Sequence, residues 1–141
     1  MKRLLLFLMS SLLLTGGAWA FPAAKTPEVV VEALEAYKAA GHQGFFNRLV
    51  QFGPLKDDPK NQLNGFLHRA NSLGFYRDHE VVRCQALSNR VTRTYLIIHY
   101  TEGVLFLRVD SYLPPEGRNV TTTLKWSTDS EAILPFVFTE K

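Results

Sequence analysis

Two alternating apolar segments, residues 94–101 and 104–111, constrain the fold most, and Glu102-Gly103 separates them. A dipeptide ending in glycine suits a tight turn that needs positive φ angles, and such a turn would pair Tyr100 with Leu105. Because side chains alternate along a strand, one face then holds Leu96, Ile98, Tyr100, Leu105, Leu107 and Val109. The other face is mixed and holds Arg93, Tyr95, Ile97, His99, Phe106, Arg108, Asp110 and Tyr112. We therefore expect a one-sided antiparallel sheet whose apolar face is covered by helices.

The N-terminus has the three parts of a secretory signal peptide. Lys2-Arg3 precedes an apolar run from Leu4 to Leu14, and small residues end at Ala20. The run is shorter than the roughly 20 apolar residues that a membrane span needs. Phe21, not a cysteine, directly follows the expected cleavage point at Ala20, so a lipid-anchored lipoprotein is not indicated. We expect residues 1–20 to be removed and the protein to be periplasmic or secreted, with membrane contact only during export.

Length and charge limit the remaining classes. Removing 20 of the 141 residues leaves 121, which predicts a single domain over residues 21–141. The signal carries two of the 16 basic residues, so 14 remain against 13 acidic ones. This near balance leaves no basic patch, and nucleic acid is not an expected partner.

Cys84 is the only cysteine, so the chain has no internal disulfide. We interpret Cys84 as a small buried residue in a strand, with a thiol nucleophile or an intermolecular bridge as the alternatives.

Three helices are predicted before the strands. Thr26 is expected as the N-cap residue of the first helix, with Pro27 at the first helical position and Glu28 in the first turn, and Gly41 would end that helix. Phe45, Phe46, Leu49 and Val50 predict a second, shorter helix before Gly53-Pro54. Asp58-Pro59 begins a third helix with an apolar stripe that ends at Gly74.

After Gly74 the apolar period changes from 3.6 to 2, which predicts four strands over residues 75–88, 91–101, 104–113 and 119–128. Placing Tyr112 opposite Asn119 adds Val120, Thr122, Leu124 and Trp126 to the apolar face and Thr121 to the mixed one. In the first strand, a two-residue turn at Asn89-Arg90 would place Arg83 and Gln85 on the apolar face. A bulge, a longer turn or a polar opening in the core would each account for this. The apolar segment 132–138 contains Pro135, so we expect an edge strand or a docked tail.

This is an α+β pattern: three N-terminal helices on one face of a curved antiparallel meander sheet. From Pro27 to Thr128 the order of elements resembles the NTF2-like (cystatin-like) superfamily, in which a curved sheet wraps helices into a cone. The short hairpin usual before the third helix is missing here. The resemblance implies a fold that hosts isomerases, dehydratases, ligand-binding domains and non-catalytic assembly modules, and therefore assigns no single function.

No common phosphate-binding, metal-binding or nucleophile motif is present, and His42, His68, His79 and His99 lie apart at spacings that form no metal pair. No cofactor is therefore expected. On the mixed face, Asp110 or His99 could move a proton while Tyr95 stabilises an oxyanion. The alternative, which we favour, is a structural ladder of cross-strand pairs.

Two binding hypotheses remain. Aromatic and arginine residues on the mixed face are typical of interfaces, which predicts a homodimer or a protein partner bound through Tyr95, Ile97, Phe106, Arg108, Asp110 and Tyr112. A pocket between helices and sheet would instead hold a small apolar ligand through His79, Arg83, Gln85, Tyr100 and Trp126. We favour a non-enzymatic binding domain over a small-molecule-binding or isomerase-type enzyme. The volume and filling of the interior would discriminate between them.

Overall fold

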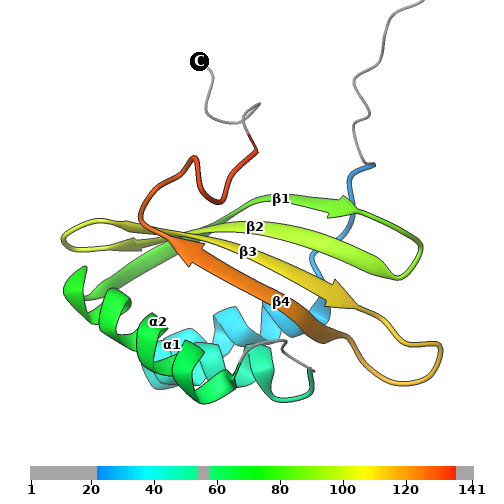
Figure 1. The fold of residues 1–141 in the computed structure, drawn as a ribbon, viewed down its shortest axis with the longest axis horizontal. Coiled ribbons are helices and arrows are strands. Elements are labelled where there is room, and N and C mark those ends of the chain that lie inside the picture. Colours follow the sequence, from blue (N-terminus) through cyan, green and yellow to red (C-terminus); the bar gives the residue numbers. More distant parts are fainter. Residues whose placement is uncertain (1–21, 54–57, 136–141) are drawn as a thin grey trace, which may run out of the picture.

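The computed structural model describes residues 22–53 and 58–135. It has an α+β fold with two helices and a four-stranded antiparallel sheet in the order β1-β2-β3-β4 (Figure 1). The elements are α1 (Glu28–Val50), α2 (Pro59–Ser72), β1 (Tyr76–Ala86), β2 (Val91–Tyr100), β3 (Val104–Tyr112) and β4 (Val120–Ser127). Both helices cover one face of the sheet, so the predicted α+β class and meander are confirmed. The predicted signal peptide lies outside the described residues.

The helices number two rather than three. Gly41 adopts φ 65° and ψ −157°, which bends α1 there without ending it. Glycine tolerates this left-handed φ because it has no Cβ. The two predicted N-terminal helices are therefore one kinked helix. Pro27 occupies its N-cap position without a side-chain cap bond, so the predicted cap at Thr26 is wrong.

Helix α2 begins as its sequence predicts. The side chain of Asp58 accepts a hydrogen bond of 3.0 Å from the backbone N–H of Lys60, and Pro59 follows the cap. Phe66 and Ala70 are the buried residues of this helix. The chain then passes Gly74, at φ 89°, into β1.

The central hairpin keeps the predicted faces but has a different register. Ile98, not Tyr100, lies opposite Leu105, because the chain turns at Thr101 and Glu102, one residue earlier than predicted. The N–H of Tyr100 donates to the carbonyl of Gly103 at 2.8 Å. The register shift is two residues, and side chains alternate with period two, so each residue stays on its predicted face.

Strand β1 departs further from the prediction. Its register shifts between Tyr76 and Asp78 and again between Val81 and Arg83, and the turn to β2 spans residues 87–90. Arg83 pairs with Tyr95 and Gln85 with Arg93, so both point away from the helices. A bulge and a longer turn together therefore explain the polar residues of β1, and the prediction that they lie on the apolar face is wrong.

A bulge also divides the β3–β4 pair. Asp110 lies opposite Thr123 but Ser111 lies opposite Thr121, which leaves Thr122 as the extra residue. Tyr112 consequently pairs with Val120 instead of the predicted Asn119. Thr121 therefore lies beside Ser111 on the helix side, where it is fully buried, and Val120 lies beside Tyr112 on the outer face. The predicted faces of both residues are wrong.

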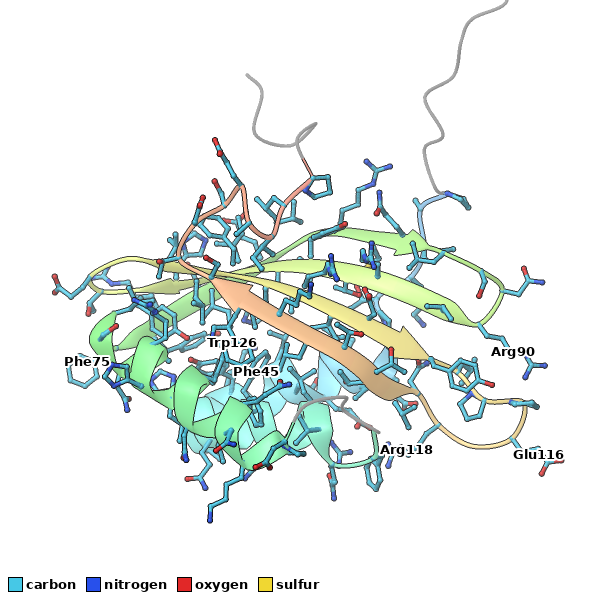
Figure 2. All side chains as sticks on the ribbon, viewed as in Figure 1. Phe45, Phe75, Arg90, Glu116, Arg118 and Trp126 are labelled. Atoms are coloured by element: carbon cyan, nitrogen blue, oxygen red, sulfur yellow. The ribbon has the colours of Figure 1, made fainter. Side chains whose placement is uncertain are left out.

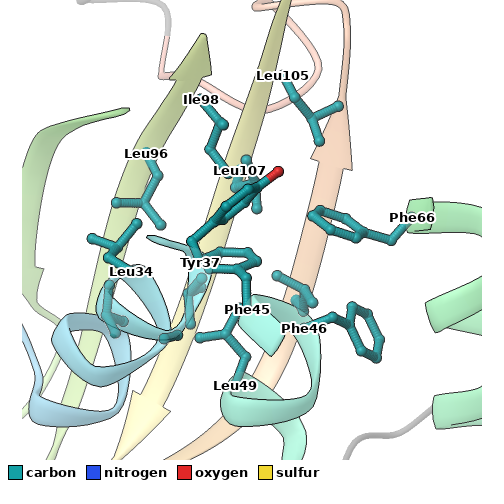
Figure 3. Packing of buried hydrophobic residues seen from close by; sticks show 14 of the residues in the cluster. Leu34, Tyr37, Phe45, Phe46, Leu49, Phe66, Leu96, Ile98, Leu105 and Leu107 are labelled. Atoms are coloured by element: carbon teal, nitrogen blue, oxygen red, sulfur yellow. The ribbon is translucent and has the colours of Figure 1, made fainter. Parts of the chain in front are cut away.

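The core fills the space between the helices and the sheet (Figure 3). Helix α1 contributes Tyr37, Phe45, Phe46 and Leu49, and α2 contributes Phe66. The apolar face of the sheet supplies Leu96, Ile98, Tyr100, Leu105, Leu107, Val109 and Leu124. After β4 the chain turns back on the side of the sheet away from the helices (Figure 1), and Ile133 and Leu134 are buried there. Of the predicted tail, this part is docked, and residues 136–138 lie outside the described ranges.

Candidate functional site

A cluster of tyrosine and histidine side chains lies where the kink of α1 approaches the end of β2. The hydroxyl groups of Tyr37 and Tyr100 are 2.6 Å apart. The Tyr37 hydroxyl also bonds to Nδ1 of His42, which directly follows the kink at Gly41. The kink therefore lets one helix place both a tyrosine and a histidine at the same end of the core.

A second pair extends this cluster to β1. The Tyr76 ring stacks on Tyr37 with centroids 4.3 Å apart, and its hydroxyl lies 2.7 Å from Nδ1 of His79. The result is a cluster of three tyrosines and two histidines built from α1, β1 and β2, which we call the Tyr–His cluster: Tyr37, His42, Tyr76, His79 and Tyr100.

Burial keeps this cluster neutral. It raises the pKa of Tyr100 to about 12 and raises the pKa of Tyr37 further, with the hydrogen bond to Tyr100 adding to the effect on Tyr37. Burial lowers the pKa of His42, and burial together with Lys38 lowers the pKa of His79. Neutral imidazoles and phenols can exchange hydrogen bonds with a polar ligand group, and an imidazole nitrogen can accept a proton.

A surface hollow of about 560 Å³ adjoins the cluster. His79 and Tyr100 contribute to its wall, and the remaining lining residues are Arg77, Asp78, Glu80, His99 and Thr101. In this hollow Nε2 of His99 lies 2.7 Å from Glu80 and 3.9 Å from Asp78. The hollow is open to solvent and its rim is polar, whereas the predicted pocket was an apolar one between the helices and the sheet.

The structure does not bring the predicted ligand-binding residues together. His79, Tyr100 and Trp126 lie on the helix side of the sheet, whereas Arg83 and Gln85 lie on the opposite face. Trp126 belongs to the far strand β4 and packs against Phe46 and Phe66, at centroid distances of 6.4 and 5.7 Å. Aromatic side chains fill the region predicted as a pocket.

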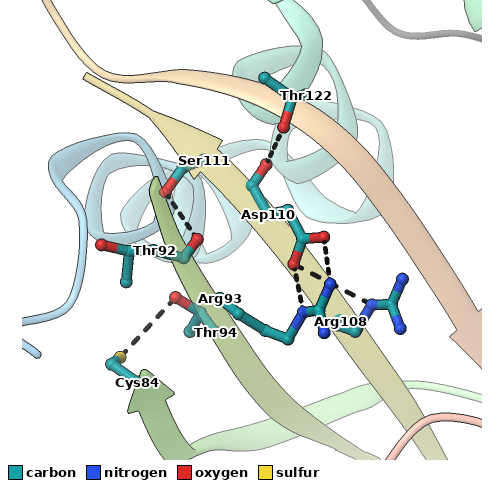
Figure 4. Close-up of polar contacts among 8 residues, drawn as sticks. All are labelled: Cys84, Thr92, Arg93, Thr94, Arg108, Asp110, Ser111 and Thr122. Atoms are coloured by element: carbon teal, nitrogen blue, oxygen red, sulfur yellow. Dashed lines mark hydrogen bonds and ion pairs between the residues drawn. The ribbon is translucent and has the colours of Figure 1, made fainter. Parts of the chain in front are cut away.

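The predicted interface residues do share one surface, the outer face, which is the side of the sheet away from the helices. Figure 4 shows two of them, Arg108 and Asp110, together with Arg93. Asp110 accepts hydrogen bonds from Nε and Nη2 of Arg93, at 2.7 and 2.8 Å. Nε of Arg108 lies 4.0 Å from the same carboxylate. The predicted register, with Tyr100 opposite Leu105, would place Tyr95 opposite Asp110. In the structure Tyr95 lies opposite Arg108, and Arg93 lies opposite Asp110.

Burial on the outer face divides these residues into two groups. Tyr95 is 4% exposed and Asp110 is 8% exposed, while Ile97, Phe106, Arg108 and Tyr112 are half-buried. Tyr95 has Arg83 and Arg108 as cross-strand neighbours, and long arginine stems can cover an aromatic ring. The second group is therefore more accessible to a partner than Tyr95 or Asp110.

The places of two residues in these clusters are not predicted from the sequence. Histidine spacing alone leaves His42 isolated, and the one sequence signal for its place is Gly41 before it, which permits a change of direction there. The sequence places Arg93 on the mixed face but does not pair it with Asp110, because the turn lies at Thr101 and Glu102, one residue earlier than predicted. The hydrogen bond to Asp110 raises the pKa of Arg93 further above its usual value, so the guanidinium group stays charged.

Cys84 is buried, in agreement with the structural interpretation, and its sulfur lies 3.7 Å from the Thr94 hydroxyl (Figure 4). The sulfur also lies 3.5 Å from the Thr26 hydroxyl. Among residues 22–53 and 58–135, His, Cys, Asp and Glu side chains form no group of three or more that could hold a metal ion. Neither helix in these ranges has the length and apolar character needed to cross a bilayer.

Comparisons with known proteins found no matching family model, no similar curated protein and no similar solved structure.

Proposed function

We propose that this chain is a non-enzymatic binding domain that binds a protein partner, or a second copy of itself, through the outer face of its sheet. The observation that carries this proposal is the composition of that face. Ile97 lies opposite Phe106 across β2 and β3, beside the row formed by Tyr95 and Arg108. Aromatic and arginine side chains beside apolar ones are enriched at the centres of protein interfaces.

The filled interior supports the same proposal. Phe45, Phe46 and Phe66 are buried at 0–1% exposure between the helices and the sheet. A small-molecule site usually needs a concave cavity of several hundred Å³ lined by apolar side chains. The side of the sheet that the resemblance would assign to a ligand is thus occupied by core.

The proposal also includes a more specific fold, the NTF2-like cone. The kink at Gly41 divides α1 into segments 28–40 and 42–50, which with α2 correspond to the three predicted helical segments. We infer an NTF2-like cone on this basis, with the outer face as its convex side. Convex sheet faces are common dimer surfaces in proteins that resemble this superfamily.

Export through a signal peptide is also proposed, from the residues before Ala20. Expression of the full chain in a bacterial host with fractionation would test it. We expect the periplasmic or secreted protein to begin at Phe21 by N-terminal sequencing, and an uncleaved cytoplasmic product would contradict export.

Charge substitutions on the outer face test the binding proposal. Ile97→Asp and Phe106→Asp place carboxylates in the proposed contact, and both residues are half-buried, so the fold should persist. Asn64→Asp, on the exposed side of α2, is the matched control. Partners captured from a source extract, and the solution mass of the purified protein, are the measurements.

We expect both outer-face variants to lose a partner or self-association that the control variant retains, with unchanged circular dichroism. If the wild type and all three variants capture the same proteins and have the same mass, the proposal is wrong.

The Tyr–His cluster favours a second candidate, a small-molecule-binding or isomerase-type site. Its hollow of about 560 Å³ places His79 and Tyr100 beside solvent, where a neutral imidazole could exchange a proton with a bound ligand. Screening phenols and small ketones by NMR would test this candidate. A specific ligand should shift the His79 signals of the wild-type protein but not the His79 signals of the Tyr100→Phe variant. Equal shifts in both proteins would exclude the cluster as the site.

A further inference from the structure

The most exposed large apolar side chain of the described residues is Phe75, which lies at one end of the molecule (Figure 2). It is 82% exposed, whereas the other large apolar side chains on the surface are 39–44% exposed. An aromatic ring of this kind buries about 150–250 Å² when a partner covers it. A ring left this open is a strong candidate for an interface anchor.

The backbone on both sides of Phe75 is held in place. Its N–H donates to Oγ1 of Thr101 at 3.1 Å, and its carbonyl accepts from the N–H of Thr101 at 2.9 Å. The N–H of Glu102 donates to the carbonyl of Leu73 at 2.9 Å. Gly74 sits between them at φ 89°, where an added Cβ would lie 2.1 Å from Thr101 Oγ1. Phe75 is therefore presented by a preorganised corner, which lowers the entropy lost on binding.

The opposite end of the molecule carries a hollow of about 540 Å³ that is lined by both apolar and polar side chains. It lies between the start of α1, the β1–β2 turn and the end of β3, and Val31 and Leu113 form its exposed apolar walls at 40% and 42% exposure. The N–H of Leu113 donates to the carbonyl of Arg90 at 2.8 Å, which joins two walls. Arg90 and Phe75 lie at opposite ends of the long axis (Figure 2).

Charges at the two ends are complementary. Glu102 lies directly beside the Phe75 corner, since its Cγ would be 3.2 Å from a Cβ at Gly74. Lys25 and Arg90 line the hollow, with Glu28 as the single carboxylate among its lining residues. When Phe75 of one molecule approaches the hollow of another, Glu102 beside it faces a rim with net positive charge. This attraction favours one relative orientation of the two molecules.

We propose that copies of this protein associate head to tail, with Phe75 of one copy inserted into the hollow between Val31 and Leu113 of the next. The ring and the hollow lie on different ends, so the contact is heterologous and each added copy exposes a new Phe75 and a new hollow. The assembly is an open chain along the long axis. One aromatic anchor buries less than the roughly 1,200 Å² of a stable interface, so the association is weak and needs high protein concentration.

Sedimentation velocity over increasing protein concentration tests this proposal. We expect the weight-average mass of the wild type to rise steadily past that of a dimer, and Phe75→Ser to remain monomeric. Leu113→Glu should also remain monomeric, because a carboxylate then occupies the hollow. Val81→Ser, which removes another exposed apolar side chain, is the control and should associate like the wild type.

Mixing the two interface variants separates this contact from any symmetric one. Phe75→Ser keeps an intact hollow and Leu113→Glu keeps an intact Phe75, so their mixture should form a dimer that cannot grow. Circular dichroism and thermal melting establish that each variant is folded. A wild type that stays monomeric to its solubility limit, a plateau at dimer mass, or a monomeric mixture of folded variants would overturn the proposal.

Discussion

The two faces of this sheet come from the same strands but have different physical characters. On the helix side, Leu96, Ile98 and Leu107 are fully buried and pack against phenylalanines from both helices. On the outer face, the intervening positions hold the Arg93–Asp110 ion pair, Tyr95 and the half-buried Ile97 and Phe106. The helix side provides most of the folding stability. The outer face carries charged, aromatic and apolar side chains that contribute less to the free energy of unfolding. This difference is why we place binding on the outer face.

Matched phenylalanine truncations should show the largest difference between the faces. Phe66→Ala removes a fully buried ring and should lower the free energy of unfolding by about 3–5 kcal/mol, because a cavity remains. Phe106→Ala removes a half-buried ring from the outer face and should cost about 1 kcal/mol. Urea denaturation of both variants measures these values. Equal losses would show that the outer face is also part of the core.

The carboxylate of Asp110 is the structural centre of the outer face. Asp110→Ala leaves Arg93 without its two hydrogen bonds and should lower the free energy of unfolding by about 2–3 kcal/mol. Asp78→Ala, an exposed carboxylate on the same face, should change it by less than about 0.5 kcal/mol. Denaturation curves with and without high salt would measure both. A negligible loss in Asp110→Ala would mean that the pair is only an exposed surface contact.

Thr121 is a polar exception on the helix side. Its hydroxyl oxygen is buried, and no hydrogen-bond partner for it lies within the described part of the chain. Thr121→Val replaces this hydroxyl with a methyl group of similar size, so we expect a gain of about 1 kcal/mol in unfolding free energy. Thr94→Val is the control, because Thr94 accepts from the Cys84 thiol at 3.7 Å and gains less. A stability loss in Thr121→Val would show that the hydroxyl is satisfied.

The smallest effect concerns pH at the Tyr–His cluster. Burial lowers the pKa of His42 in the folded protein below the value near 6.5 of the unfolded chain. Above pH 6.5 His42 is neutral in both states, and the fold has its full stability. That stabilisation is lost as the pH falls through the folded pKa. Thermal melting from pH 8 to pH 5 should therefore show a smaller decline in His42→Gln than in the wild type, whereas His68→Gln should follow the wild type. Identical profiles of melting temperature against pH for all three proteins would show that protonation of His42 does not affect the stability of the fold.

Much of the fold follows from local sequence patterns. The change of apolar period after Gly74 located all four strands to within a few residues, and Asp58-Pro59 located α2. The hairpin register differs from the predicted one by two residues. Side chains also alternate with a period of two residues, so the predicted faces of the hairpin residues are still correct.

The failures share one cause, which is that bulges and kinks depend on packing. The bulge beside Arg83 and the one at Thr122 reverse the side-chain direction of their neighbours, and no local motif marked either of them. The continuation of α1 through Gly41 likewise depends on contacts made by Phe45 and Phe46. The Tyr–His cluster and the Arg93–Asp110 pair could not be predicted, because each needs the correct register.

Site-specific photo-crosslinking tests the assignment of binding to the outer face most directly. A photoreactive amino acid would replace Ile97 on the outer face or, as the control, Asn64 on the exposed side of α2. Our account predicts discrete adducts with a partner, or with a second copy, from position 97 and none from position 64. Adducts from position 64 alone, or from neither position in a folded protein, would contradict it.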